Sequence, residues 1–250
     1  MARSRFRSHR PIDVNDDPNI FAPVFYVLCG TTVLCVLMLA IRTIRLDSGG
    51  YHFLLWNLFL AWLPLVAAML AVGAARRLRG ALLGPALFVF GAAWLLLYPN
   101  APYLTTDLIH LISDSAYHWS TREQSVLVWY DLIVFFLFSW CGLLLGYLSM
   151  LYFHLLVRRF AGGFAGWLFV VVVSFLGGFG VYLGRVIRLN SWDAVFSPFR
   201  LIEGVQSGLD GRGAKFTLLF GMLILIVYLS LSSLRGLGAA KPDTPDAKAA

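Results

Sequence analysis

The fold is decided by residues 126–156, VLVWYDLIVFFLFSWCGLLLGYLSMLYFHLL, in which Asp131 is the only Asp, Glu, Lys or Arg. The hydrocarbon core of a bilayer is roughly 30 Å thick, and about 20 predominantly apolar helical residues cross it. This run is longer than that, so we expect a helix that tilts or extends beyond the hydrocarbon core. An apolar run of this length indicates a membrane span rather than a helix of a soluble domain.

Five further apolar runs flank this one, and charged or Pro/Gly-marked breaks separate them. They cover residues 21–41, 52–74, 81–98, 164–184 and 216–234. Pro99 and Pro102 are expected to stop the third run, because proline lacks an amide hydrogen and restricts the residue before it. The chain is 59% hydrophobic and 13% charged, which is far from the balance of a soluble domain. We therefore predict an all-α fold, a polytopic membrane bundle of about six transmembrane helices with two interfacial amphipathic helices in its long connections.

The apolar runs divide the chain into three predicted parts. These are a basic cytoplasmic tail over residues 1–20, a single transmembrane domain over 21–234 and a disordered tail over 235–250. With the N-terminus inside, the inner segments hold twelve of the 20 Lys and Arg residues and the outer segments eight. This excess predicts cytoplasmic termini and places the two long connections, residues 99–125 and 185–215, outside. The basic residues lie at the ends of apolar runs, so the net charge of +7 does not predict nucleic-acid binding.

Four polar residues in the first long connection share one side of a predicted surface helix. They are Asp107, His110, Asp114 and His118. Their spacing of three, four and four places them within a sector of about 80°, and Thr105 or Thr106 is available as an N-cap. Two carboxylates and two imidazoles on one stripe could bind a divalent metal, or act as general acid and base. The alternative is that they form only the solvated face of an interfacial helix.

The second long connection begins with Arg185 and Arg188, which share a helix face. Their planar guanidinium groups suit phosphate or carboxylate, so a lipid headgroup or a phosphorylated lipid carrier is a plausible ligand. The alternative is that they extend towards the membrane surface, or pair with an acid such as Asp107 or Asp131. Further along, Ser197-Pro198 has the pattern of an N-cap and a first helical residue, which predicts a second interfacial helix.

Asp131 follows Trp129 and Tyr130, an aromatic pair typical of the membrane interface, and is expected about one turn into the membrane. An acid at this depth either belongs to a functional site or pairs with an arginine. Gly142 has Gly146 four residues later, a spacing that lets membrane helices approach closely, and the pairs Gly162/Gly166 and Gly180/Gly184 repeat it.

Our main hypothesis is that the two long connections fold over one end of the bundle and form one polar site. The expected catalytic residues are Asp107, His110 and Asp131, and the expected substrate-binding residues are Asn100, Arg185, Arg188, Asn190 and Asp193. Such a site could bind or process a lipid headgroup or a lipid-linked substrate. The residues leave open whether this is catalysis, and a divalent metal is the only cofactor that they suggest.

Two other functions are kept as alternatives. Asp131 and the arginines could line the pathway of a small-solute or ion transporter. The polar connections could also bind a membrane protein partner, as in a non-catalytic accessory subunit. The sequence contains no P-loop, dinucleotide fingerprint, His-Glu-x-x-His or Gly-x-Ser-x-Gly motif, so the commonest soluble-type active sites are not expected.

Several unusual segments resemble a known group of proteins. They are Tyr98-Pro99-Asn100-Ala101-Pro102-Tyr103, Trp129-Tyr130-Asp131 and Asn190-Ser191-Trp192-Asp193. They resemble the family called domain of unknown function 1361, over a region from about the second to the sixth span. The resemblance implies a multi-pass protein of the bacterial inner membrane, and it implies no reaction.

Overall fold

The structure is a computed structural model that describes residues 22–46, 50–113 and 122–239. Within these ranges the chain is helical and contains no strand. Five described runs are long and apolar enough to cross a membrane: Val24–Arg45, Phe53–Arg77, Gly80–Leu111, Val126–Ile187 and Gly211–Arg235. They confirm the predicted helical membrane bundle. The basic N-terminal tail, Asp114 and His118 lie outside the described residues.

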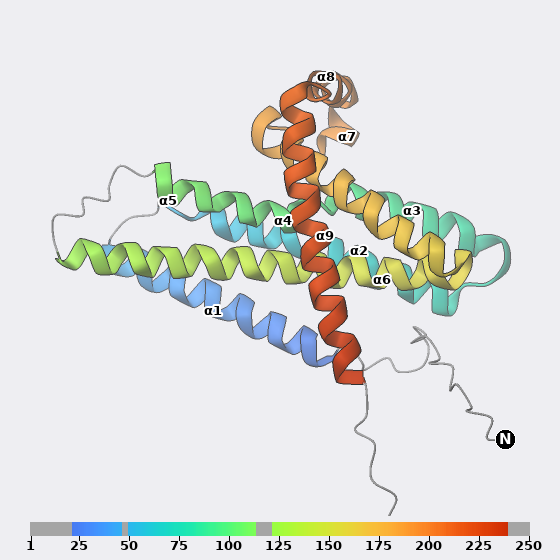
Figure 1. The fold of residues 1–250 in the computed structure, drawn as a ribbon, viewed down its shortest axis with the longest axis horizontal. Coiled ribbons are helices and arrows are strands. Elements are labelled where there is room, and N and C mark those ends of the chain that lie inside the picture. Colours follow the sequence, from blue (N-terminus) through green and yellow to red (C-terminus); the bar gives the residue numbers. More distant parts are fainter. Residues whose placement is uncertain (1–21, 47–49, 114–121, 240–250) are drawn as a thin grey trace, which may run out of the picture.

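The longest helix, α6 (Arg122–Tyr182), is a hairpin of two arms. At Gly162 the backbone has φ 89° and ψ 173°, a conformation that favours glycine because a side chain would clash with the backbone there. Residues 163–182 fold back from this point and leave the line of residues 122–161 (Figure 1). We call residues 122–161 the first arm and residues 163–182 the second arm. The five runs therefore contain the six apolar segments expected from the sequence.

Helices α1 (Ala22–Leu46) and α2 (Phe53–Arg77) run beside the first arm, and α9 (Gly211–Ala239) crosses the hairpin (Figure 1). The crossing requires glycine on both sides. A Cβ atom built on Gly178 would lie 2.7 Å from the backbone nitrogen of Gly221. Large apolar side chains face outwards, such as Phe88 at 77% and Phe164 at 84% exposure, as expected for surfaces in contact with lipid.

The chain continues in helical turns beyond the prolines that were expected to stop it. Helix α3 (Leu83–Leu97) follows a 3₁₀ turn (η1, Gly80–Leu82) and does end before Pro99. The short helix α4 (Asn100–Tyr103), a second 3₁₀ turn (η2, Leu104–Leu108) and α5 (Ile109–Ser113) come next. Pro102 fits within α4 because the first turn of a helix has amide hydrogens without intrahelical partners, so a missing one costs little.

Glycines let α4 sit between the two arms of α6. A Cβ built on Gly142 would lie 2.5 Å from the carbonyl oxygen of Ala101, and one built on Gly180 would overlap the ring of Pro99. The close backbone approach predicted at Gly142 and Gly180 is therefore present. Their partner is the short turn around Asn100.

The second long connection forms a π-helical turn (η3, Leu183–Ile187), α7 (Asp193–Phe196) and α8 (Pro198–Gly208). Helix α8 begins at Pro198 as predicted, although the Ser197 side chain makes no capping hydrogen bond. A Cβ on Gly204 would overlap Leu189, so this glycine allows α8 to pack directly on the turn after Arg188.

Candidate functional site

The centre of the site is an ion pair between the two long connections. Nη1 of Arg185, which follows the second arm, lies 3.1 Å from Oδ1 of Asp107 in η2. Oδ2 of Asp107 accepts a hydrogen bond of 2.8 Å from the side-chain amide of Asn57 on α2. Asp107 is completely buried. A buried carboxylate needs partners on its oxygens, and here two different helices supply them.

The guanidinium of Arg185 makes two further hydrogen bonds within the protein. Nη2 donates to the carbonyl oxygen of Thr106 at 3.0 Å, and Nη1 also donates to the Tyr103 hydroxyl at 3.3 Å. The same guanidinium lies 5.5 Å from the centre of the Tyr103 ring. These contacts hold Arg185 in one place, so the arginine and Asp107 act as a clamp that joins α2, η2 and η3.

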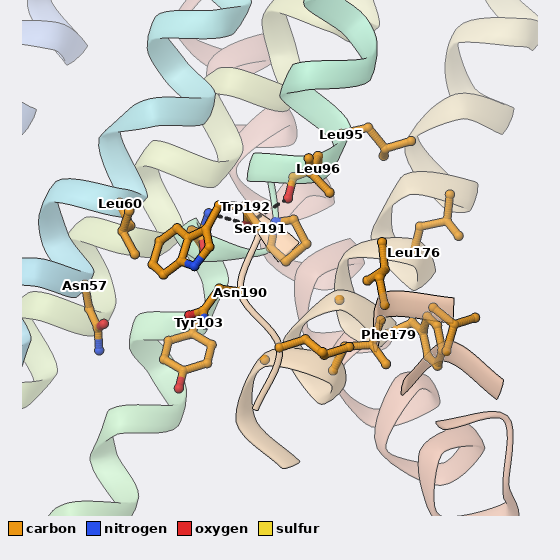
Figure 2. Close-up of a pocket in the computed structure, with 18 of the residues that line it drawn as sticks. Asn57, Leu60, Leu95, Leu96, Tyr103, Leu176, Phe179, Asn190, Ser191 and Trp192 are labelled. Atoms are coloured by element: carbon orange, nitrogen blue, oxygen red, sulfur yellow. Dashed lines mark hydrogen bonds between the residues drawn. The ribbon is translucent and has the colours of Figure 1, made fainter. Parts of the chain in front are cut away.

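The segment Leu189–Trp192 is fastened to the end of α3 by a second set of hydrogen bonds (Figure 2). The Asn100 amide donates to Oγ of Ser191 at 3.1 Å, and Ser191 donates to the carbonyl oxygen of Leu96 at 3.1 Å. Asp193 accepts the backbone N–H of Asn190 at 2.8 Å, which closes the turn between them. Asn100 and Asp193 thus hold this segment in position.

The backbone before this segment is unusual at two neighbouring places. Arg185 lies in the π-helical turn, and Arg188 has φ 64°, the only positive φ of a described residue other than glycine. Single π-turns and left-handed residues other than glycine are uncommon and are concentrated at functional sites. No described residue forms an ion pair or hydrogen bond with the exposed side chain of Arg188.

A largely apolar cavity of about 570 Å³ lies between α2, α3, the second arm and α8. In Figure 2, Trp192, Tyr103 and Asn57 lie on one side of this cavity, and Leu176 and Phe179 lie on the other. Its lining is mostly aliphatic or aromatic, and the polar exceptions are Asn57, Asn100, Asn190 and Ser191. We call it the apolar cavity.

A second cavity of about 520 Å³, which we call the basic cavity, adjoins the first. Its lining is Tyr103, His110, Gly184, Arg185, Arg188 and Asn190. Three of these, Tyr103, Gly184 and Asn190, also line the apolar cavity. A polar compartment with positive charge therefore shares a wall with an apolar one.

The structure brings most of the expected site residues to these two cavities. Asn100 and Asn190 line the apolar cavity, and His110, Arg185, Arg188 and Asn190 line the basic one. Asp131 instead pairs with Arg42 of α1, at 2.6 and 2.8 Å. Asp131 was expected to join the polar site or to pair with an arginine such as Arg185. Its partner comes from α1, a helix on which no site residue was expected.

Asp107, the first residue of the expected polar stripe, does not lie on a solvated face. Asp107 lies in a 3₁₀ turn and is buried, because that turn directs it towards Asn57 and Arg185. Thr105 and Thr106 do not cap a helix; their hydroxyls donate back to the carbonyl oxygens of Pro102 and Tyr103. The described residues contain no group of three His, Cys, Asp or Glu side chains that could hold a metal ion.

Sequence reasoning missed Asn57 and Tyr103 as site residues. Asn57 is a single amide within the apolar run of α2. This position is the signal that could have identified it, because a polar side chain within a span needs a polar partner. Tyr103 had no distinguishing spacing, since its role depends on the close approach of η3 at Gly184.

Comparisons with known proteins agree with the resemblance seen in the sequence. The family described as "Protein of unknown function (DUF1361)" matches residues 56–227, which include the clamp and the lining of both cavities. No curated protein and no solved structure matches the chain. Because the match covers more than half of the chain, the protein belongs to the DUF1361 family.

Proposed function

We propose that the protein binds an amphiphilic molecule, with its apolar part in the apolar cavity and its anionic headgroup in the basic cavity. The observation that carries this proposal is the wall shared by the two cavities through Tyr103, Gly184 and Asn190. A molecule lying across this wall would have aliphatic side chains around one end and guanidinium groups at the other. A lipid or a lipid-linked precursor with a phosphate or carboxylate group has this distribution.

The two arginines have different roles in this proposal. Arg185 is held by Asp107, Thr106 and Tyr103, so it supplies a fixed positive charge in the wall of the basic cavity. Arg188 has no partner among the described residues and is free to form a bidentate contact with an anionic oxygen. Asp107 lines neither cavity, so we assign it a positioning role through Arg185.

Proton transfer stays a prediction, and of the three expected catalytic residues His110 is the one that lines a cavity. His110 lines the basic cavity and lies 4.7 Å from the ring of Phe53, measured between ring centres. A metal held partly by Asp114 and His118 also stays a prediction, as do transport and an accessory role. We further propose that the protein lies in a bacterial inner membrane with cytoplasmic termini and an extracytoplasmic site, as the distribution of basic residues favours.

The test uses the purified protein in phosphatidylcholine nanodiscs and an alkyl phosphate that carries a photoreactive group on its chain. We expect photolabelling of the second arm and α3 that excess dodecyl phosphate suppresses and dodecanol does not. Arg188→Gln should weaken competition by dodecyl phosphate about tenfold, the effect of one lost charge-assisted contact. The matched control is Arg200→Gln, which removes an exposed charge from α8 outside both cavities.

Leu176→Trp tests the apolar half of the site, because the indole ring is larger than the leucine side chain and would fill part of the apolar cavity. It should reduce labelling while leaving the protein folded. Equal competition by dodecyl phosphate in wild type, Arg188→Gln and Arg200→Gln would show that the basic cavity does not hold the headgroup, and the proposal would fail.

A further inference from the structure

A second polar cluster lies towards the fold-back of α6, and none of its members lines either cavity. His154 of the first arm is only 3% exposed, and its Nδ1 lies 2.5 Å from the Tyr228 hydroxyl of α9. The ring of Trp167, on the second arm, packs edge-on against His154 with 4.9 Å between ring centres. The cluster therefore joins both arms of the hairpin to α9.

Two nitrogen atoms of this cluster are buried without a hydrogen-bond partner. They are Nε2 of His154 and Nη1 of Arg235. If Tyr228 donates to Nδ1, then Nε2 carries the proton and is a donor, as every guanidinium nitrogen is. Nearly all buried polar groups in native proteins have a partner, because leaving one unpaired costs free energy. The two donors therefore indicate a partner that the described chain does not supply.

A second arginine lies beside them. A Cβ atom built on Gly166 would overlap Cγ of Arg158 and would lie 3.0 Å from Nε2 of His154, so both side chains lie against this glycine. The charges of Arg158 and Arg235 both act on the imidazole. No Asp or Glu of the described residues forms an ion pair with either arginine. The cluster thus has donors and positive charge without a carboxylate of the described chain to balance them.

We propose that His154, Arg158 and Arg235 form a second anion site, which takes a phosphate group between the two arms and α9. Basic pockets between transmembrane helices commonly bind the phosphate of lipid headgroups. Trp167 is 44% exposed at this place, and tryptophan is enriched at the level of the headgroups. The phosphate can come from a membrane lipid or from free phosphate, and the two sources are distinguishable by experiment. This site is independent of the proposed function.

The test is carried out on Arg188→Gln protein, in which anion binding at the basic cavity should already be about tenfold weaker. In a neutral detergent, the midpoint of thermal unfolding is measured against added dihexanoyl phosphatidylglycerol, dihexanoyl phosphatidylcholine or inorganic phosphate. We expect phosphatidylglycerol to raise the midpoint more than phosphatidylcholine does. Adding Arg158→Gln or Arg235→Gln should weaken this effect about tenfold, the consequence of one lost charge-assisted hydrogen bond.

The matched control is Arg79→Gln, which removes an exposed charge that has no place in the cluster. A response to inorganic phosphate that depends on Arg158 and Arg235 supports the site with free phosphate as its ligand. A response to phosphatidylglycerol alone supports a lipid headgroup. The proposal is overturned if Arg79→Gln weakens the ligand-induced rise of the unfolding midpoint as much as the cluster variants do. It is also overturned if neither cluster variant weakens that rise. His154→Gln retains a side-chain donor and provides a second folded variant, which should bind more weakly than wild type.

Discussion

Replacing Asp107 by Asn should loosen the clamp between the two long connections. The substitution keeps the size of the side chain and an acceptor for Asn57, but it removes the charge that faces Arg185. Arg185 is 21% exposed and the carboxylate of Asp107 is completely buried, so the pair is largely shielded from water. Breaking a buried ion pair by removing one partner costs about 3–5 kcal/mol. We expect the lower end, about 3 kcal/mol, because Arg185 keeps its bonds to Thr106 and Tyr103.

A double-mutant cycle with Arg185→Met measures the interaction itself. If the two side chains act as one clamp, the double variant should lose less unfolding free energy than the two single variants lose together. The expected difference is roughly 0.5–3 kcal/mol, the range for residues in contact. The measurement is reversible unfolding in mixed detergent micelles, followed by circular dichroism. Arg212→Gln is the control, because its ion pair with Asp210 is exposed and should contribute little to stability.

Additive losses in this cycle would refute the reasoning, because the two residues would then stabilise the fold separately. A loss in Asp107→Asn no larger than that of Arg212→Gln would refute the burial argument. Alkyl phosphate labelling of the same variants links the clamp to the site. A clamp that positions Arg185 should weaken headgroup binding in Asp107→Asn as well.

Three further predictions concern the helix contacts, a helix cap and the topology. Gly142→Ala places a Cβ 2.5 Å from a backbone oxygen of α4 and should lower stability by about 1–3 kcal/mol in the same unfolding assay, whereas Gly30→Ala, which meets no atom within 4 Å, should not. Asp210 accepts the N–H of Gly213 at 2.6 Å, which holds the pKa of its carboxyl below the usual value. The cap therefore stabilises α9 at pH values above the ordinary Asp pKa, and this stabilisation is lost as the pH falls through the lowered pKa of Asp210. The difference in stability between wild type and Asp210→Ala should therefore become smaller in acid. A difference that stays constant with pH would contradict this. In a cysteine-free background, an impermeant thiol reagent on intact cells should label Glu203→Cys but not Arg79→Cys; the reverse pattern would place the site on the cytoplasmic side.

The sequence predicted the helices better than it predicted their ends. Apolar runs and their lengths are local properties, so they indicated the spans and even the excess length of the run that became the first arm. The prediction that Pro102 stops a helix was wrong, because proline is tolerated in the first turn of a helix and α4 begins just before this residue. The start of α8 at Pro198 was predictable, since proline at a first helical position is a local preference.

The polar stripe of the first long connection shows where local reasoning fails. Spacings of three and four residues describe one face only when the chain turns by about 100° per residue. Asp107 lies in the 3₁₀ turn before α5, where it is buried against Asn57 and Arg185, and this tertiary contact cannot be read from the spacing. His110 lines the basic cavity, and its role in a functional site stays a prediction.

The sequence by itself determined that this is a helical membrane protein, and it predicted a polar site in two long connections. Hydrophobic length and charge at the ends of apolar runs are properties of single segments, and they need no knowledge of neighbours. Only the tertiary structure decided that Asp107 pairs with Arg185 and Asp131 with Arg42. Either acid could have met any of these arginines. The choice depends on the fold-back at Gly162 and on the close contacts at Gly142 and Gly180, because these positions set which helices lie side by side.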